Sequence, residues 1–494
     1  MIKVVSFNIL CGGKDDNTIA LRAPRLKEVL AKYDPDLVGF QEATPVWMPY
    51  LEEYYGEEYE IFNKPRKVTN PESTPMMWRK SRFECLDKGY FWFSDIPDVE
   101  YGTTWDTWGC NRICMWAILR DKQSGETIHF FNTHYGFGDD NQLKSGDLIL
   151  KHIDALKADR VVLTADFNMH PTSPGYKQIT ARLRDANTEN LPRNTFHGFG
   201  PFEGHCRIDF CFVSPNTLVP SNYKVIDDLV DGKYPSDHFG VYTELEVKET
   251  LRLVSFNVKC NGHEPIERAR RLRKLLRDYQ ADLVGLQEVT PPFEEILGRA
   301  DEYGMFLVYR GENSKEGTPI LWKKDRFDVV HQEYFWLSET PDVESKGWGA
   351  HYLRIANLMV LQYKGSNRKI CLLNSHYDGG EPGVKAIEFV KEKLAPYFGE
   401  MPVFLTGDFN MMCSSAGYKK MIEDYKDVRY EVAPSDGTPT TNGFDVQTDP
   451  PRIIDYVFTN GVGCTPKTYK VMTERPKGQF VSDHYGLFTT FIIE

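Results

Sequence analysis

The chain has 494 residues, of which 41% are hydrophobic and 26% charged, a composition typical of soluble globular proteins. Since a single hydrophobic core stops growing at about 250–300 residues, this length predicts more than one domain. The formal net charge of −12 argues against a broad basic surface that coats a polyanion, but it leaves open a local site for one phosphate group.

Residue alternation and turn residues predict mixed strands and helices in the first half of the chain. The predicted strands cover residues 2–8, 36–41, 76–78, 113–120, 127–132, 161–164 and 208–213. The predicted helices cover residues 25–32, a segment that opens at Pro45, and residues 143–158. The section from residue 59 to 131 has strands without intervening helices, which favours antiparallel pairing. We therefore expect helices on the outer faces of two packed sheets.

The second half of the chain repeats this order of elements. Its predicted strands cover residues 251–257, 282–287, 319–323, 355–363, 370–374, 402–407 and 453–458. Its predicted helices cover residues 266–279 and 384–396.

Polar motifs repeat together with these elements. Asn8 recurs as Asn257 and His134 as His376, at separations of 249 (257 − 8) and 242 (376 − 134) residues. A period of this length is far too long for a solenoid repeat of about 20–50 residues. We therefore predict a tandem duplication of one large domain. The two domains are residues 1–248, called unit 1, and residues 249–494, called unit 2.

Ten cysteines are scattered through both halves without a Cys-x-x-Cys pair, which favours reduced thiols over a disulfide framework. No apolar run of about 18 residues could span a bilayer, and the N-terminus does not resemble a signal peptide. We therefore expect a cytoplasmic protein without membrane insertion. We infer no obligate protein partner.

The residues that repeat most faithfully are polar, and they lie at the ends of predicted strands, where a rigid scaffold presents chemically active groups. Glu42 and its repeat Glu288 follow short buried strands. Asp166 and Asn168 are two residues apart, so an extended backbone would point both side chains the same way. Carboxylate and carboxamide oxygens suit Mg2+ or Mn2+. Histidines without neighbouring cysteines favour acid–base roles beside such an ion over a zinc–thiolate site.

Six motifs occur in the same order in both halves: Asn at the end of the first strand, Gln-Glu, Asn-Thr/Ser-His, Asp-Phe-Asn, an Asp after Arg-Ile, and Ser-Asp-His. This series resembles the endonuclease/exonuclease/phosphatase superfamily, whose members are similar to deoxyribonuclease I. The resemblance implies an α/β (α+β) fold of two tandem four-layered sandwiches, each with two packed, mostly antiparallel sheets flanked by helices. It also implies a Mg2+-dependent phosphoester hydrolase, with Mn2+ as a possible substitute.

The resemblance assigns roles to matching positions in both units. Those implied for metal binding are Asn8, Glu42, Asp237, Asn257, Glu288 and Asp483. Those implied to orient the attacking water and the phosphate are Asp166, Asn168, Asp408 and Asn410. The histidine that acts on the water and the aspartate that orients it would be His238 with Asp209 and His484 with Asp455. The second histidine of each unit would be His134 or His376, and the arginine that clamps the phosphate Arg112 or Arg354.

The loops around these residues differ between the halves. Trp105-Asp106 stands against Trp348-Gly349, and Thr195-Phe196-His197 against Thr441-Asn442-Gly443. We therefore expect two substrate preferences, with a small or non-polymeric phosphoester favoured over nucleic acid. Cleavage of DNA or RNA remains an alternative, as does a binding or scaffold protein with one silent domain.

Several other segments allow two interpretations. The aromatic segments Phe91–Ser94 and Phe335–Ser338, together with Trp105, Trp108 and Trp348, either pack in the core or stack on a substrate. For His197 and His205, which have no evident repeat in the second half, local hydrogen bonding is favoured. The Arg-rich stretch at 268–277 is spaced like the solvated face of a helix, which is favoured over a nucleic-acid patch.

Overall fold

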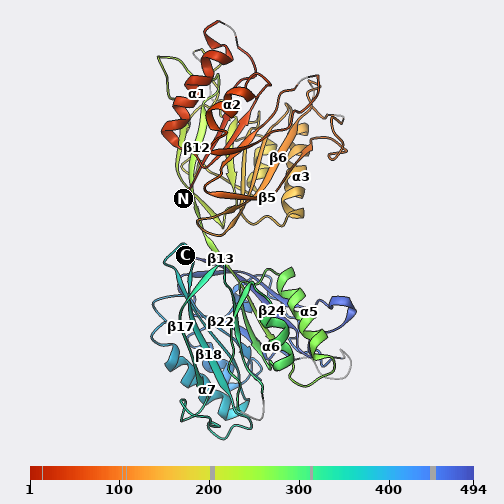
Figure 1. The fold of residues 1–494 in the computed structure, drawn as a ribbon, viewed down its shortest axis with the longest axis vertical. Helices are drawn as coiled ribbons and strands as arrows, with labels where there is room; N and C mark the ends of the chain where they lie inside the picture. The colour runs from red at the N-terminus through yellow and green to blue at the C-terminus, as the bar shows by residue number, and fades with distance from the viewer. Residues whose placement is uncertain are drawn as a thin grey trace. The chain divides into compact units, whose positions relative to one another are not determined.

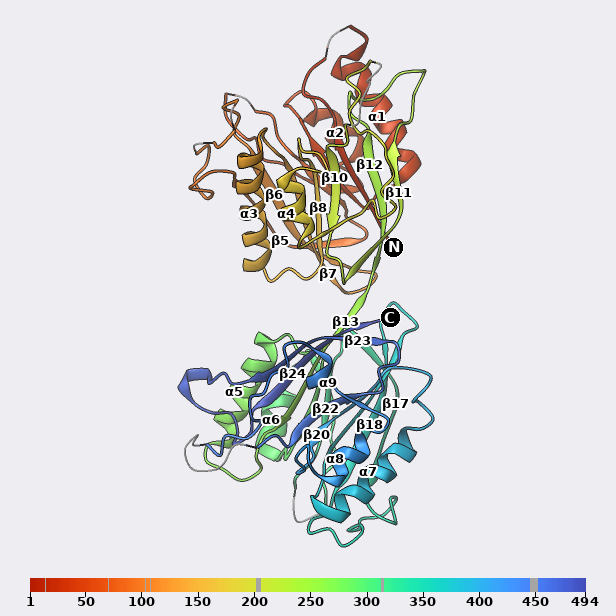
Figure 2. The ribbon, with the colours of Figure 1, turned by 180° about the vertical axis from the view of Figure 1, so that it is seen from behind.

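The computed structural model describes residues 1–13, 15–69, 71–102, 104–106, 108–200, 206–311, 315–444 and 452–494. They divide into two compact units, Met1–Lys248 and Glu249–Glu494, which Figures 1 and 2 show from opposite sides. Among the described residues, no helix is long and apolar enough to cross a membrane. All ten cysteines are free thiols.

The strands of unit 1 are β1 (Ile2–Asn8), β2 (Leu37–Gln41), β3 (Tyr59–Phe62), β4 (Met76–Arg79), β5 (Phe83–Trp92), β6 (Ile113–Asp121), β7 (Thr127–His134), β8 (Val161–Asp166), β9 (Arg184–Asp185), β10 (Asp209–Val213), β11 (Leu218–Ile226) and β12 (Gly240–Val247). Its helices are α1 (Ile19–Tyr33), α2 (Met48–Tyr55), α3 (Asp139–Ala155) and α4 (Pro174–Thr180), with a 3-10 turn at Asp15–Asn17.

The strands of unit 2 are β13 (Glu249–Asn257), β14 (Leu283–Gln287), β15 (Tyr303–Phe306), β16 (Ile320–Lys323), β17 (Phe327–Trp336), β18 (Ile355–Tyr363), β19 (Lys369–His376), β20 (Val403–Asp408), β21 (Lys426–Asp427), β22 (Asp455–Thr459), β23 (Cys464–Met472) and β24 (Gly486–Ile493). Its helices are α5 (Pro265–Asp278), α6 (Pro291–Gly298), α7 (Gly380–Leu394), α8 (Ala416–Met421) and α9 (Val428–Glu431), with a 3-10 turn at Pro476–Gly478.

Each unit contains two six-stranded sheets. The strand orders in unit 1 are β11-β12-β1-β2-β4-β3 and β5-β6-β7-β8-β10-β9. Those in unit 2 are β15-β16-β14-β13-β24-β23 and β17-β18-β19-β20-β22-β21. Each sheet has one parallel pair among its described strands, and these pairs are β1 with β2, β7 with β8, β13 with β14, and β19 with β20. The sheets are therefore mostly antiparallel, as predicted.

Each unit buries its sheets between helices. In β1, Val4 faces the core between the two sheets, whereas the next residue, Val5, packs under Leu26 of α1. This alternation follows from the pleat of a strand, which points successive side chains to opposite faces. On the outer face of the other sheet, Ile149 of α3 packs against Leu163 of β8. Figure 1 shows α1 and α2 on one side of unit 1 and α3 on the other.

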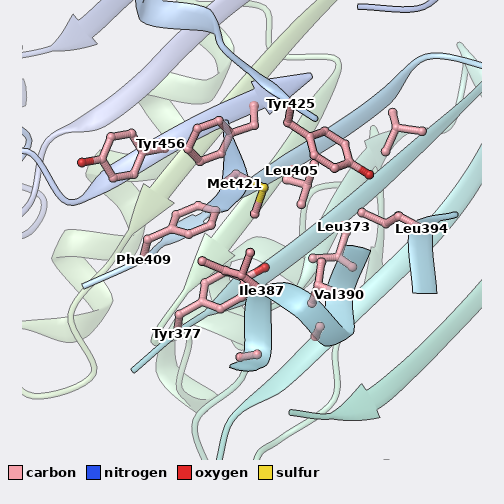
Figure 3. Packing of buried hydrophobic residues seen from close by; sticks show 14 of the residues in the cluster. Leu373, Tyr377, Ile387, Val390, Leu394, Leu405, Phe409, Met421, Tyr425 and Tyr456 are labelled. Atoms are coloured by element: carbon pink, nitrogen blue, oxygen red, sulfur yellow. The ribbon is translucent and has the colours of Figure 1, made fainter. Parts of the chain in front are cut away.

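Unit 2 repeats this packing. Ile387 and Val390 of α7 lie on Leu373 of β19 and Leu405 of β20, as Figure 3 shows from close by. With α5 and α6 on the outer face of the other sheet, the order is helix, sheet, sheet, helix. The predicted α/β fold of two tandem four-layered sandwiches is confirmed.

A buried polar network joins the two sheets beneath the site. Gln41 Nε2 donates to Asn132 Oδ1 at 2.8 Å, and Thr164 Oγ1 donates to the same oxygen at 3.0 Å. Asn132 in turn donates to the carbonyl of Phe40 at 2.7 Å. A Cβ atom on Gly39 would lie 2.2 Å from Thr164 Oγ1, so this close approach of the sheets requires glycine. Gln287, Asn374, Thr406 and Gly285 repeat the arrangement in unit 2.

Several element boundaries differ from the predicted ones. Helix α1 begins at Ile19 and carries Pro24 inside it, whereas the prediction began the helix after this proline. Strand β7 continues to His134, because polar site residues extend it beyond its apolar run. Strand β5 was not predicted. It is an edge strand, and its middle is exposed and lacks a clear hydrophobic alternation.

Candidate active site

The parallel strand pairs bring the predicted site residues of unit 1 together at one edge of the sandwich. Strand β1 ends at Asn8, and β2 ends in register beside it, just before Glu42. Strands β7 and β8 end in register at His134 and Asp166, and Asp209 at the start of β10 pairs with Asp166. The same register in unit 2 joins His376 with Asp408 and Asp408 with Asp455, and places Asn257 beside the strand that ends before Glu288.

Asn8 links the two carboxylates at the centre of this edge. Its Nδ2 donates to Glu42 Oε1 at 3.1 Å and to Asp166 Oδ2 at 2.9 Å. The backbone N–H of Cys11 donates to Glu42 Oε2 at 3.0 Å. Burial acts to raise the pKa of Glu42, but the charge of His134 and these hydrogen bonds lower it to about 2. The matching distances in unit 2 are 3.0, 2.9 and 2.9 Å, among Asn257, Glu288, Asp408 and Cys260.

The orientation of Asn8 refines its expected role. We expected an oxygen ligand for a metal ion, but the NH2 group faces the two acids, and Oδ1 accepts a hydrogen bond from the Leu10 N–H at 3.0 Å. Asn257 does the same with the Lys259 N–H. Both asparagines therefore hold carboxylates in place, with one oxygen lone pair left for a ligand.

The backbone at Asn168 corrects one prediction. Asn168 has a φ of 48° and its N–H donates to Asp166 Oδ1 at 3.0 Å, so the chain turns here and is not extended. Glu42 and Glu288 also have positive φ, at 61° and 62°. Left-handed backbone at a non-glycine residue costs about 1–3 kcal/mol and concentrates at functional sites. Its recurrence at matching positions of both units indicates that it serves the site.

His238 is held by two aspartates. Its Nδ1 lies 3.0 Å from Asp209 Oδ2, and its Nε2 lies 3.8 Å from Asp166 Oδ2. Burial acts to lower the pKa of His238, but the negative charges of Asp209, Asp166 and Asp237 raise it to about 10. These aspartates therefore favour the protonated imidazole, which donates hydrogen bonds through both of its nitrogens. In unit 2, the corresponding distances are 2.9 and 3.8 Å, from His484 to Asp455 and Asp408.

His134 lies on the other side of Asp166. Its Nε2 is 3.1 Å from Asn168 Nδ2 and 3.4 Å from Asp166 Oδ2. Its Nδ1 has no hydrogen-bond partner among the described residues and faces Glu72 Oε1 at 3.7 Å. The corresponding contacts in unit 2 are 3.0, 3.5 and 3.8 Å, from His376 to Asn410, Asp408 and Glu316.

Glu72 belongs to a buried ion pair that the sequence analysis missed. Arg66 binds both of its oxygens, with Nη1–Oε1 at 2.6 Å and Nη2–Oε2 at 2.8 Å. Arg310 and Glu316 form the same pair in unit 2. The signal was present in the sequence, because both residues recur at one offset of 244 (310 − 66 and 316 − 72). The repeat was not predicted to be functional, because these residues lie in a loop and not at the end of a predicted strand.

The two predicted phosphate clamps, Arg112 and Arg354, are buried but take their carboxylate partners from different loops. Arg112 Nε donates to Asp106 Oδ2 at 3.1 Å, whereas Arg354 Nε donates to Asp378 Oδ1 at 2.8 Å. Asp378 occupies the position of Gly136 in unit 1, two residues after the histidine. Asp378 therefore replaces Asp106, which the sequence comparison matched with Gly349. Nη1 of each arginine is buried without a partner among the described residues, so each guanidinium has a donor left for a ligand.

Residues 5–238 and 254–484 both match the model of the Endonuclease/Exonuclease/phosphatase family. The chain belongs to this family. The two matches cover the site residues of both units, so the predicted tandem duplication is confirmed.

Each of the similar proteins named next matches half of this chain or less. Tyrosyl-DNA phosphodiesterase 2 of Gallus gallus is 26% identical over 242 residues, which are 46% of this chain and 62% of that protein. Carbon catabolite repressor protein 4 homolog 3 of Arabidopsis thaliana is 30% identical over 148 residues, 28% of this chain and 31% of that protein. A solved family member from Bacteroides thetaiotaomicron is 25% identical and covers 50% of this chain and 100% of its own, with a TM-score of 0.47. The chain thus spans 62% of the length of the first relative.

The residues of both units fit the divalent cation that the family resemblance implies. Ligand atoms of Glu42, His134 and Asp166 lie within 4.8 Å of one another, as do those of Asp166, Asp209 and His238. Asp237, another predicted ligand, is close enough to Glu42 that burial and the charge of Glu42 raise the pKa of Asp237. This concentration of buried negative charge is costly without a cation, and its oxygen donors suit a hard ion. The same two groupings in unit 2 are Glu288, His376 and Asp408, and Asp408, Asp455 and His484.

For most of the aromatic residues, the structure decides between packing in the core and stacking on a substrate. Both aromatic segments are buried, so they pack in the core: Phe91, Trp92, Phe93, Phe335 and Trp336. Trp105 and Trp348 are half-buried against helix–sheet clusters. Trp108 is 76% exposed and lies with its ring 5.6 Å from that of Phe137, three residues after His134. Trp108 therefore remains a candidate for stacking on a substrate of unit 1.

The structure also corrects the alignment of one loop. Thr195 Oγ1 accepts from the Asp209 N–H, and Thr440 Oγ1 accepts from the Asp455 N–H, so Thr195 corresponds to Thr440 and not to Thr441. His197 then has a counterpart, which is Asn442. Each accepts a hydrogen bond from the backbone N–H two residues later, which supports the local role expected for His197. His205 lies outside the described residues.

Proposed function

We propose that the chain is a Mg2+-dependent phosphoester hydrolase with an active site in each unit. The observation that carries the proposal is the recurrence of one polar arrangement, with matching distances, at the same edge of both sandwiches. Costly buried charges and left-handed backbone recur with it. A scaffold protein with a silent domain has no need to keep these features twice.

In unit 1, Glu42 and Asp237 would hold the cation, and a bound cation would supply positive charge that neutralises the phosphate. Arg112 binds the phosphate, because its buried Nη1 is a donor without a partner among the described residues and Asp106 fixes the guanidinium plane. Glu288, Asp483, Arg354 and Asp378 take these parts in unit 2.

Asp166 accepts the proton of the attacking water, because it lies between both histidines and is buried. His238, held as a cation by Asp209, donates to the phosphate oxygens and stabilises their growing negative charge. Asn168 Nδ2 lies 3.1 Å from His134 Nε2 and orients this imidazole, and His134 would protonate the oxygen of the leaving group as its bond to phosphorus breaks. One positioned proton-transfer group of this kind contributes about 10²–10⁴ to the rate.

We favour a small or non-polymeric phosphoester as the substrate, and different substrates for the two units. The net charge of −12 offers little long-range attraction for a polyanion. The rims also differ: unit 1 exposes Trp108 and Phe137, whereas unit 2 exposes Tyr352 beside Arg354. A DNA phosphodiester is the second candidate, because several relatives are tyrosyl-DNA phosphodiesterases and Trp108 is placed to stack on a base.

The test compares the full chain with Glu42→Gln, Glu288→Gln and the double variant in the presence of Mg2+. Substrates are supercoiled plasmid, RNA, a generic aryl phosphodiester and a panel of phosphorylated metabolites. We expect each single variant to lose the activity of one unit and the double variant to lose all hydrolysis. Full activity of the double variant would refute the proposal. Efficient plasmid nicking by both single variants, with matching profiles, would favour a nuclease.

A further inference from the structure

The loop after the first strand carries a different side chain in each unit on a matching backbone. Leu10 in unit 1 and Lys259 in unit 2 each follow the site asparagine by two residues, with φ values of 56° and 59°. Their N–H groups donate to that asparagine at 3.0 Å in both units. Their carbonyls accept from a buried arginine of the following helix, Arg22 at 2.9 Å or Arg268 at 2.7 Å. The exchange of Leu10 for Lys259 is therefore a change of side chain alone.

The Lys259 ammonium lies among the residues proposed to bind the cation of unit 2. Its Nζ is 3.1 Å from Asp483 Oδ2, and the side chains of Lys259 and Asp483 are 36% and 18% exposed. A lysine amine is a cation at neutral pH, and this one lies against a carboxylate that is proposed to bind the divalent ion. In unit 1, Asp237 has no ion pair with lysine or arginine among the described residues.

We propose that Lys259 acts as a built-in monovalent competitor, so that unit 2 binds a divalent cation more weakly than unit 1. This inference rests on the proposed function. A divalent ion at Glu288 and Asp483 meets the repulsion of the ammonium, and it must also take Asp483 from its partner. A single close charge commonly shifts a proton equilibrium by about 1–3 pKa units, and a doubly charged ion feels twice the force. We therefore expect a difference in cation affinity of at least about tenfold.

The difference would make the two units respond to different cation concentrations. At limiting Mg2+, unit 1 would be loaded while Lys259 neutralises part of the acidic cluster of unit 2. At higher Mg2+, unit 2 would be loaded as well. One chain would then hydrolyse one class of phosphoester over a wide range of Mg2+ and a second class only when Mg2+ is abundant.

The test measures cation binding by the full chain with titration calorimetry, using Mn2+ and Mg2+ alone. Glu42→Gln leaves unit 2 as the site under study, and Lys259→Leu or Lys259→Met is added to it. Leucine is the residue of unit 1, and methionine keeps an unbranched stem without the charge. The reciprocal variant, Leu10→Lys, is added to Glu288→Gln. Thermal unfolding of each variant checks that it is folded.

We expect Lys259→Leu and Lys259→Met to tighten cation binding by unit 2 at least about tenfold, and Leu10→Lys to weaken that of unit 1 comparably. Equal affinities of the two units, or no change on replacing Lys259, would overturn the inference while the proposed function stands. If neither unit of the unaltered chain binds a divalent cation at millimolar concentration, both the inference and the proposed function are refuted. Tightening by leucine without tightening by methionine would assign the effect to shape and would also overturn the inference.

Discussion

Asp106 and Asp378 come from different loops of their units, yet each carboxylate binds Nε of the buried arginine beside the site. A Cβ atom on Gly136, which stands where unit 2 has Asp378, would lie 2.9 Å from Asp106 Cγ. The two solutions therefore exclude each other in space. The exchange means that each predicted phosphate clamp keeps a carboxylate partner, although the sequence comparison matches Asp106 with Gly349.

This exchange predicts a rescue. In a Glu288→Gln background, Asp106→Gly should lower kcat/KM of unit 1 by about 10²-fold, because Arg112 loses the partner that fixes it. Adding Gly136→Asp with Asn141→Gly should recover most of the loss. The second change is needed because Asn141 Nδ2 would lie 2.1 Å from the new Cβ, and unit 2 has Gly383 at that place. Steady-state kinetics measures both effects. The control adds Gly136→Asp to the Asp106→Gly variant without Asn141→Gly, and it should not recover kcat/KM.

Activity should depend on both histidine–aspartate pairs. The double variant His238→Ala with His484→Ala should lose hydrolysis altogether, since each imidazolium stabilises charge on the phosphate of its own unit. Each single variant should lose the activity of one unit by about 10²–10⁴-fold. Initial rates on any phosphoester that the unaltered chain cleaves measure this. Wild-type turnover by the double variant would show that the mechanism is wrong.

The buried pair Arg66–Glu72 should separate stability from activity. Glu72→Ala alone should destabilise unit 1 by about 3–5 kcal/mol, because it leaves Arg66 buried without its partner. Replacing both, as Arg66→Met with Glu72→Leu, should restore most of the stability. Hydrolysis by unit 1 of the double variant should nevertheless be slower than that of the unaltered chain, because His134 then lacks the carboxylate at its Nδ1. Urea unfolding and kinetics in the Glu288→Gln background test the split, and normal activity of the double variant would rule out a role for Glu72.

Acid should unfold unit 2 partly through Asp282, which is buried among Arg326, Arg252 and Lys323. Burial acts to raise the pKa of Asp282, but these cations lower it below its ordinary value. A depressed pKa contributes stability above the unfolded value of about 3.9, and this is lost as the pH falls through the folded pKa. Asp282→Asn should therefore destabilise unit 2 at pH 7 by about 3–5 kcal/mol, and this difference should shrink as the pH falls below about 3.9. Urea midpoints between pH 7 and 2.5 measure this, and a constant difference would contradict it.

The sequence by itself determined the duplication, the order of most strands and the residues at their ends. Asn8, Glu42, His134 and Asp166 could be found because each follows an apolar run of its own, and local periodicity places the end of a strand. The motifs then identified the family, and the fold followed from that resemblance. Their register across the sheets, which brings His134, Asp166 and Asp209 together, was implied but not visible in any local pattern.

Only the tertiary structure decided which loop residues meet. Asp106 and Asp378 are equivalent in space but not in alignment, and Lys259 reaches Asp483 across more than two hundred residues of sequence. The turn at Asn168 likewise depends on a hydrogen bond to its neighbour and not on hydrophobic alternation. Loops carry no periodic pattern, and their partners are chosen by the packing of strands that lie far apart in the chain. The differences between the two units lie in such loops, so the sequence predicted two sites and the structure shows how their surroundings differ.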